Sequence, residues 1–205
     1  MKDYFIEGLI SAVNPINLLF YLVIAFIVSK ATIEKKASGI FITLLAGISF
    51  IIYNLLINLQ LNQKNWDFLF YTEIFLNVLL IIILPLYIIL NNRFKKLPIF
   101  LYVLITLIAV CKTAFIIANR FSSKIEVEDY ENIKVLVNPI SVMVYTLGSA
   151  LLLPIYTYFI SINLQRKQNK KWLRILYIVI LLLIVIYSII STTYFLMVLK
   201  TQNVA

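Results

Sequence analysis

Two residues of opposite charge lie inside long apolar stretches of this sequence. Glu73 is flanked by Phe, Leu and Ile residues, and Lys112 follows the single cysteine, Cys111, in a similarly apolar segment. A charge in such a segment pairs with an opposite charge, contacts water or binds a ligand, because a lone charge is costly to bury in a membrane. We predict that Glu73 and Lys112 pair with each other.

Amide and hydroxyl side chains accompany this pair at helical spacing. Asn77 follows Glu73 by four residues, and Tyr145 follows Ser141 by four. Residues three or four apart share one face of a helix, so we expect these faces to point inward. The predicted polar site consists of Asn14, Asn54, Glu73, Asn77, Lys112, Asn138, Ser141 and Tyr145.

A short motif occurs twice. The segment 13–16 (Val-Asn-Pro-Ile) is followed by Tyr21, and the segment 137–140 has the same four residues and is followed by Tyr145. A proline within a helix frees a backbone carbonyl, so Pro15 and Pro139 are predicted bending points that flank one site. The alternative is that both prolines occupy a first helical turn and that both asparagines cap a helix.

An Asn-Pro pair early in a membrane span resembles the motif of the LysE-type exporters and of the CcdA-type redox transporters. The resemblance covers residues 8–20. Ile16 and Ile140 stand where the redox family has cysteine after the proline. What the resemblance implies is a helical membrane protein with a role in transport.

Several kinds of chemistry are excluded by composition. The sequence has no histidine and one cysteine, so zinc sites, histidine-ligated haem and internal disulfides are not expected. Glu73 is the only acid within an apolar segment, and no pair of acid and base or activated nucleophile can be assembled around it. We therefore expect no catalytic residues, no metal, no cofactor and no enzymatic activity.

The elements that position these residues follow from hydropathy. Of the 205 residues, 62% are hydrophobic and 13% are charged, which exceeds what one soluble core can hide. A bilayer core takes roughly 20 apolar residues per helix. The sequence predicts an all-α, polytopic membrane protein, with one integral membrane domain over residues 1–205. Its six transmembrane helices form three hairpins and span approximately 8–29, 37–61, 68–90, 99–119, 136–162 and 173–199.

The loops set the predicted orientation. Basic residues crowd the loops after the first, third and fifth spans, against the single acid Glu34; they are Lys30, Lys35, Lys36, Arg93, Lys95, Lys96, Arg166, Lys167, Lys170, Lys171 and Arg174. The positive-inside rule places these loops in the cytoplasm of a multi-pass plasma-membrane protein, with the N and C termini outside. Anionic lipid headgroups at the basic loops account for the net charge of +9 without a nucleic-acid partner.

Depth within the spans suggests a function. At 1.5 Å per residue, Asn14, Glu73 and Lys112 lie roughly 9 to 12 Å below the outer boundary, whereas the inner halves of the spans are almost wholly apolar. We expect an outward-facing polar site in a small membrane transporter or channel component, whose ligand is a small solute or an ion. The alternative is a non-enzymatic accessory, receptor-like or immunity subunit that binds a ligand, a partner protein or a second copy of itself. In a purely structural interpretation, the ion pair and the amides only hold helices together.

Overall fold

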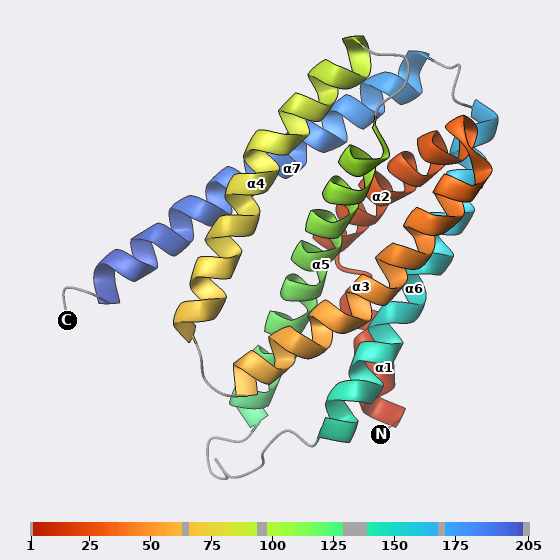
Figure 1. Ribbon diagram of the computed structural model, residues 1–205. Helices are drawn as coiled ribbons and strands as arrows, with labels where there is room; N and C mark the ends of the chain where they lie inside the picture. Colours follow the sequence, from red (N-terminus) through yellow and green to blue (C-terminus); the bar gives the residue numbers. More distant parts are fainter. Residues whose placement is uncertain (1, 63–65, 94–97, 129–138, 168–170, 203–205) are drawn as a thin grey trace.

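The protein is a bundle of long α-helices (Figure 1). The computed structural model describes residues 2–62, 66–93, 98–128, 139–167 and 171–202. Within these ranges the chain forms seven helices: α1 (Lys2–Ala12), α2 (Pro15–Glu34), α3 (Lys36–Asn62), α4 (Trp66–Arg93), α5 (Ile99–Glu128), α6 (Pro139–Lys167) and α7 (Lys171–Gln202). The helices α2 to α7 are long and apolar enough to cross a membrane. The predicted all-α, multi-pass membrane architecture is therefore confirmed.

The span predicted over residues 8–29 is divided between α1 and α2. The break falls at Asn14, whose φ of −57° and ψ of 135° are not helical. Its side-chain oxygen accepts a hydrogen bond from the Ile16 N–H at 3.0 Å, and Pro15 occupies the first turn of α2. Because proline has no N–H to satisfy there, the Asn-Pro pair starts a new helix inside the apolar segment. The first crossing thus begins at Pro15, and α1 is a separate short helix.

The second Asn-Pro copy lies at the edge of the described residues. Among these residues α6 begins at Pro139, and because 129–138 lie outside them, both the predicted bend at Pro139 and its first-turn alternative stay predictions. The proline inside α6 is Pro154, and the proline inside α4 is Pro85. Asn138 lies outside the described residues, so its predicted role in the polar site is not placed.

The short helix α1 packs against α6 (Figure 1). Two glycines bring the backbones together: a Cβ on Gly8 would meet the Tyr145 carbonyl oxygen, and one on Gly148 would meet the Phe5 carbonyl oxygen. Small residues at a crossing let membrane helices approach closely. This contact fixes α1 beside the start of α6.

The bundle has two distinct ends. Lys35 alone separates α2 from α3 in extended conformation, and its N–H donates to the Ala31 carbonyl at 2.9 Å. We call this end the corner end; α4 and α6 also finish there, and α5 and α7 begin there (Figure 1). The start of α1 and the end of α7 both lie toward the opposite end (Figure 1).

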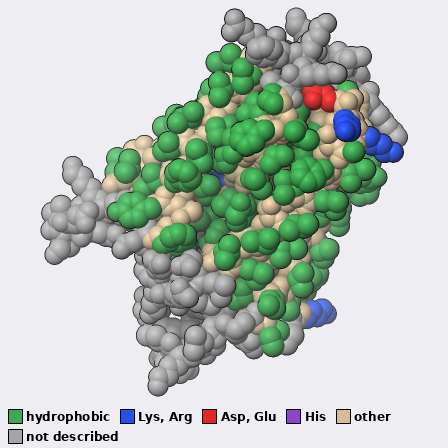
Figure 2. All heavy atoms as spheres, viewed as in Figure 1, with side chains coloured by type: hydrophobic (Ala, Val, Ile, Leu, Met, Phe, Trp, Pro, Cys, Tyr) green, Lys and Arg blue, Asp and Glu red, His purple; other side chains and the backbone are tan. Residues whose placement is uncertain are grey.

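Apolar side chains cover the outside of the helices, and α2 and α5 form the most buried part of the core. Figure 2 shows apolar side chains over most of one face, with charged side chains gathered near the ends. Half or more of the surface of many large apolar side chains is exposed, including those of Ile48, Ile52, Phe75, Ile82, Phe159 and Ile190. Such an exterior suits hydrocarbon, whereas Asn54, Glu73, Asn77 and Lys112 are buried.

Candidate functional site

The predicted pair of Glu73 and Lys112 is confirmed. Glu73 lies on α4 and Lys112 on α5, and the Lys112 ammonium donates to Oε1 of the Glu73 carboxylate. The exposed fractions are 2% for Glu73 and 0% for Lys112, so lipid and water are both excluded from the pair. The Lys112 nitrogen also lies 5.4 Å from the centre of the Tyr187 ring, which is within the range of a cation–π contact.

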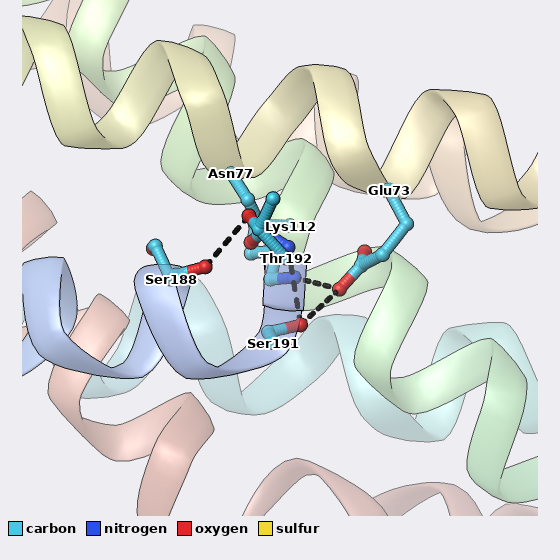
Figure 3. A network of polar contacts seen from close by, with 6 residues as sticks. All are labelled: Glu73, Asn77, Lys112, Ser188, Ser191 and Thr192. Carbon is cyan, nitrogen blue, oxygen red and sulfur yellow. Dashed lines mark hydrogen bonds and ion pairs between the residues drawn. The ribbon is translucent and has the colours of Figure 1, made fainter. Parts of the chain in front are cut away.

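The last helix contributes hydroxyl groups to this pair (Figure 3). Ser191 donates to Glu73 Oε1 at 3.2 Å and accepts from the Asn77 amide nitrogen at 3.1 Å. Thr192 donates to the Ser188 carbonyl oxygen at 2.8 Å, a bond within α7 itself. Side chains from α4, α5 and α7 converge here, and we call them the charged cluster: Glu73, Asn77, Lys112, Ser188, Ser191 and Thr192.

Three oxygen atoms in the charged cluster have no hydrogen-bond partner. They are Glu73 Oε2, Asn77 Oδ1 and Ser188 Oγ, and all three are buried. Leaving a buried polar atom unsatisfied costs about 1 to 3 kcal/mol, more for a charged group. Unpartnered buried oxygens also occur elsewhere in the described part of the chain, at Asn17, Tyr21 and Thr106, but those of the charged cluster lie beside an ion pair.

The charged cluster lies on a seam between two parts of the bundle. Helices α4 and α7 pack chiefly on each other, and they cross in Figure 1. Glu73, Asn77 and the hydroxyls therefore belong to the α4–α7 pair, whereas Lys112 comes from α5 in the core. The ion pair is thus a contact across the seam, and a shift of the α4–α7 pair would change it directly.

A second set of polar contacts, the neutral cluster, joins α1, α2, α3, α5 and α6. The Asn17 amide donates to the Ser11 carbonyl at 3.0 Å, across the break between α1 and α2. Thr146 donates to Asn54 Oδ1 at 2.9 Å, linking α6 to α3, and Tyr145 donates to the Ile117 carbonyl at 3.1 Å, linking α6 to α5. The groups in this cluster are uncharged amides, hydroxyls and backbone carbonyls.

The eight predicted site residues are thus not gathered in one place. Glu73, Asn77 and Lys112 share the charged cluster, Asn54 and Tyr145 belong to the neutral cluster, and half-buried Asn14 caps α2. Ser141 is in α6, but its side chain is outside the description, as is Asn138 altogether. Ser11 is near the end of α1, and Asn14 is at the break between α1 and α2.

Sequence reasoning assigned no site role to Asn17, Thr146, Ser188, Ser191 or Thr192. The three α7 residues have spacings of three and four, which could have marked a polar face. Asn17 follows Asn14 by three residues, so it too carried a signal. For Thr146 there was none, because a threonine in a membrane helix is often satisfied by its own backbone.

Tyrosines accompany the apolar residues of α4, α5 and α7 toward the corner end. Tyr87 on α4 and Tyr102 on α5 are buried toward the corner end, with ring centres 6.4 Å apart, and the Tyr177 ring on α7 lies 6.1 Å from Tyr87. The Tyr102 hydroxyl donates to Glu34 at 2.8 Å, and Phe26 of α2 stacks on Tyr177 at 4.3 Å. We call these the aromatic cluster.

Buried aliphatic residues separate the two levels of this seam. Between the charged cluster and the aromatic cluster along α4, α5 and α7 lie the buried residues Leu80, Leu84, Ile105, Ile108, Leu181 and Ile184. Thr106, also buried, has a hydroxyl without a hydrogen-bond partner in this layer. From the charged cluster toward the corner end, the seam is therefore lined first by polar, then by aliphatic and then by aromatic side chains.

Comparison with protein-family models, with curated proteins and with solved structures finds no match to this chain. Within the described residues, no group of three or more His, Cys, Asp or Glu side chains is placed to hold a metal ion. The function must therefore be argued from the geometry of the seam.

Proposed function

We propose that this protein is a small membrane transporter, or the channel component of one, and that the charged cluster is its ligand site. The observation that carries the proposal is the Glu73–Lys112 pair, buried across the seam between the α4–α7 pair and α5. An ionisable residue inside a membrane is by default a candidate for a functional site.

Stability alone is a weak explanation for this pair. Burying two charges costs desolvation free energy that their attraction only partly returns, and apolar replacements of similar volume are often as stable. The unused oxygens of Glu73 and Asn77 add to that cost. A ligand that binds these atoms during a transport cycle gives a reason for the arrangement that helix packing does not.

The two levels of the seam suggest how access alternates. In the conformation described, buried aliphatic side chains and the aromatic cluster fill the seam between the charged cluster and the corner end. Movement of the α4–α7 pair relative to α5 would separate Tyr87 from Tyr102 and open this part of the seam. The break at Asn14 interrupts the first apolar segment, a feature that transporter helices share.

Flux through reconstituted protein tests this function. Proteoliposomes should show electrogenic currents on a solid-supported membrane for at least one member of a panel of inorganic cations, amines and amino acids. The double variant Glu73→Gln/Lys112→Met should lose that current by at least about tenfold, because it removes the charges of the site. Thr157→Val is the matched control, since this α6 hydroxyl donates to the Leu153 carbonyl of its own helix.

If the protein is instead a non-enzymatic accessory subunit, we expect a different result. A protein that passes no tested ion or solute, yet purifies with one stoichiometric membrane partner, would contradict the transport proposal and favour an accessory subunit. A current that is unchanged in the Glu73→Gln/Lys112→Met variant would keep transport but remove the charged cluster as its site.

The orientation is also part of the proposal: the corner end faces the cytoplasm of the plasma membrane and both chain ends face outward. The basic residues around Lys35 support it through the positive-inside rule. In a Cys111→Ala background, a membrane-impermeant maleimide added to whole cells should label Asp3→Cys, which is exposed on α1. Exposed Lys36→Cys should react only after permeabilisation; the reverse pattern would overturn this orientation.

A further inference from the structure

We infer that the charged cluster binds a monovalent alkali cation, and that this cation competes with the Lys112 ammonium for the Glu73 carboxylate. The inference rests on the proposed function, because it names the ligand class of the same site. The inference is based on three observations: which atoms lack hydrogen-bond partners, the net charge of the cluster, and the groups around Lys112.

The atoms left without partners are all oxygens. Glu73 Oε2, Asn77 Oδ1 and Ser188 Oγ come from one face of α4 and one face of α7, and each of these residues is at least 98% buried. The Thr192 hydroxyl lies beside them, and its proton is already used by the Ser188 carbonyl, so its lone pairs remain as acceptors. A set of carboxylate, amide and hydroxyl oxygens is what hard cations prefer.

The charge of the cluster selects a monovalent ion. Glu73 is its only carboxylate, and no three acidic, cysteine or histidine side chains come together elsewhere in the described part of the chain. A divalent ion would leave an excess positive charge in a site from which water is excluded, which is unfavourable at low dielectric. The single negative charge of the Glu73 carboxylate balances the single positive charge of one alkali ion.

The same charge count makes Lys112 a competitor. With the ammonium bound to Glu73 the pair is neutral, so an added cation would leave one uncompensated buried charge. The cation and the Lys112 ammonium therefore exclude each other from the carboxylate, and the cation binds when Lys112 withdraws. The half-buried Tyr187 ring, already 5.4 Å from the Lys112 nitrogen, partly offsets the charge that this withdrawal leaves unpaired.

Competition predicts an outcome that a structural ion pair does not. Removing the ammonium with Lys112→Met should strengthen cation binding, because the carboxylate is then unpaired until an ion arrives. Removing the carboxylate with Glu73→Gln should abolish it. If the pair were only structural, both single variants would be destabilised alike in every salt.

The test measures thermal unfolding of the purified full-length protein in detergent, in NaCl or in choline chloride at equal ionic strength. A ligand that binds only the folded state raises the Tm with its concentration. Lys112→Met should have a higher Tm in NaCl than in choline chloride, with half-maximal NaCl at least about tenfold lower than in the wild type. Glu73→Gln and the Glu73→Gln/Lys112→Met control should respond equally to both salts.

Outcomes that overturn the inference are equally definite. Equal Tm values in the two salts for both the wild type and Lys112→Met would exclude the site. If Lys112→Met gives no folded protein even in NaCl, equilibrium binding of radioactive sodium to the wild type and to Asn77→Ala decides the matter. Undiminished sodium binding by Asn77→Ala, or no binding by the wild type, then refutes the inference.

The two proposals fail separately. Sodium-dependent stability without flux of any tested solute would leave the cation site standing and overturn the transport function. Flux that survives in choline chloride, together with salt-independent Tm values, would leave transport standing and overturn the cation site.

Discussion

The charged cluster and the neutral cluster are built from similar side chains at the cores of two different helix contacts, yet they use those side chains differently. In the neutral cluster, Thr146 donates to Asn54, Tyr145 donates to a backbone carbonyl and Asn17 bridges the break before α2, while Asn17 Oδ1 has no hydrogen-bond partner. In the charged cluster, Glu73, Asn77 and Ser188 each keep an oxygen without a partner. The clusters therefore differ chiefly in charge: the unpartnered oxygen of the neutral cluster belongs to an amide, whereas those of the charged cluster surround a carboxylate and an ammonium.

The helices around the two clusters also differ. The α1–α6 crossing is so close that Gly8 and Gly148 each face a backbone carbonyl of the partner helix. The helix α7, which carries the hydroxyls of the charged cluster, is the least buried of the six long apolar helices. The neutral cluster thus adjoins the close α1–α6 crossing, whereas the charged cluster takes its hydroxyls from the least buried of the long helices.

The largest expected effect concerns the charged pair. Glu73→Gln alone leaves Lys112 as an unpaired buried charge and should lower the free energy of unfolding by about 3 to 5 kcal/mol in choline chloride. The Glu73→Gln/Lys112→Met double variant should recover most of that loss, because no charge remains. Reversible unfolding in mixed micelles, arranged as a double-mutant cycle, measures both; an additive double variant would mean that the two residues do not interact.

The next largest effect concerns the close crossing of α1 and α6. Gly8→Ala and Gly148→Ala each place a methyl group against a backbone carbonyl and should each lower the free energy of unfolding by about 1 to 3 kcal/mol. Gly47→Ala is the matched control, since nothing lies within 4 Å of a Cβ at that position. Thermal unfolding compares the three; equal stabilities would contradict the close packing described for α1.

The smallest effect is expected in the neutral cluster. Asn54→Leu and Thr146→Val remove the two ends of one hydrogen bond, and the coupling between them should be about 0.6 to 2 kcal/mol. The same variants should leave the flux and the sodium dependence of the Tm unchanged, because the cluster is not the ligand site. A variant of Asn54 that retains stability but loses transport would erase the contrast between the two clusters.

The charged pair was predictable because a membrane leaves a lone charge few options. Glu73 and Lys112 had to pair, face water or bind a ligand, and Asn77 was assigned to the same face by its spacing of four from Glu73. The six crossings followed from hydropathy in the same direct way. The function and the orientation stay proposals, since neither is tested by the fold.

Other parts of the candidate site could not be derived from the residues. A serine or threonine on a membrane helix can bond its own backbone, as Thr192 and Thr193 do, so the polar spacing in α7 could not show that Ser191 bonds across helices. Tyr87 and Tyr102 lie within spans that hydropathy marks as apolar, because their rings are apolar and only the hydroxyl is polar. Their meeting depends on how α4 and α5 pack, which spacing within one helix does not reveal.

The order of the cluster's helices along the chain bears on how the protein is made. Glu73 on α4 is synthesised before Lys112 on α5, so its carboxylate has already entered the membrane when the lysine arrives. The serines of α7 come last and complete the cluster only when that helix docks. Until α7 docks, Glu73 and Asn77 lack the bonds that Ser191 gives them in the finished bundle.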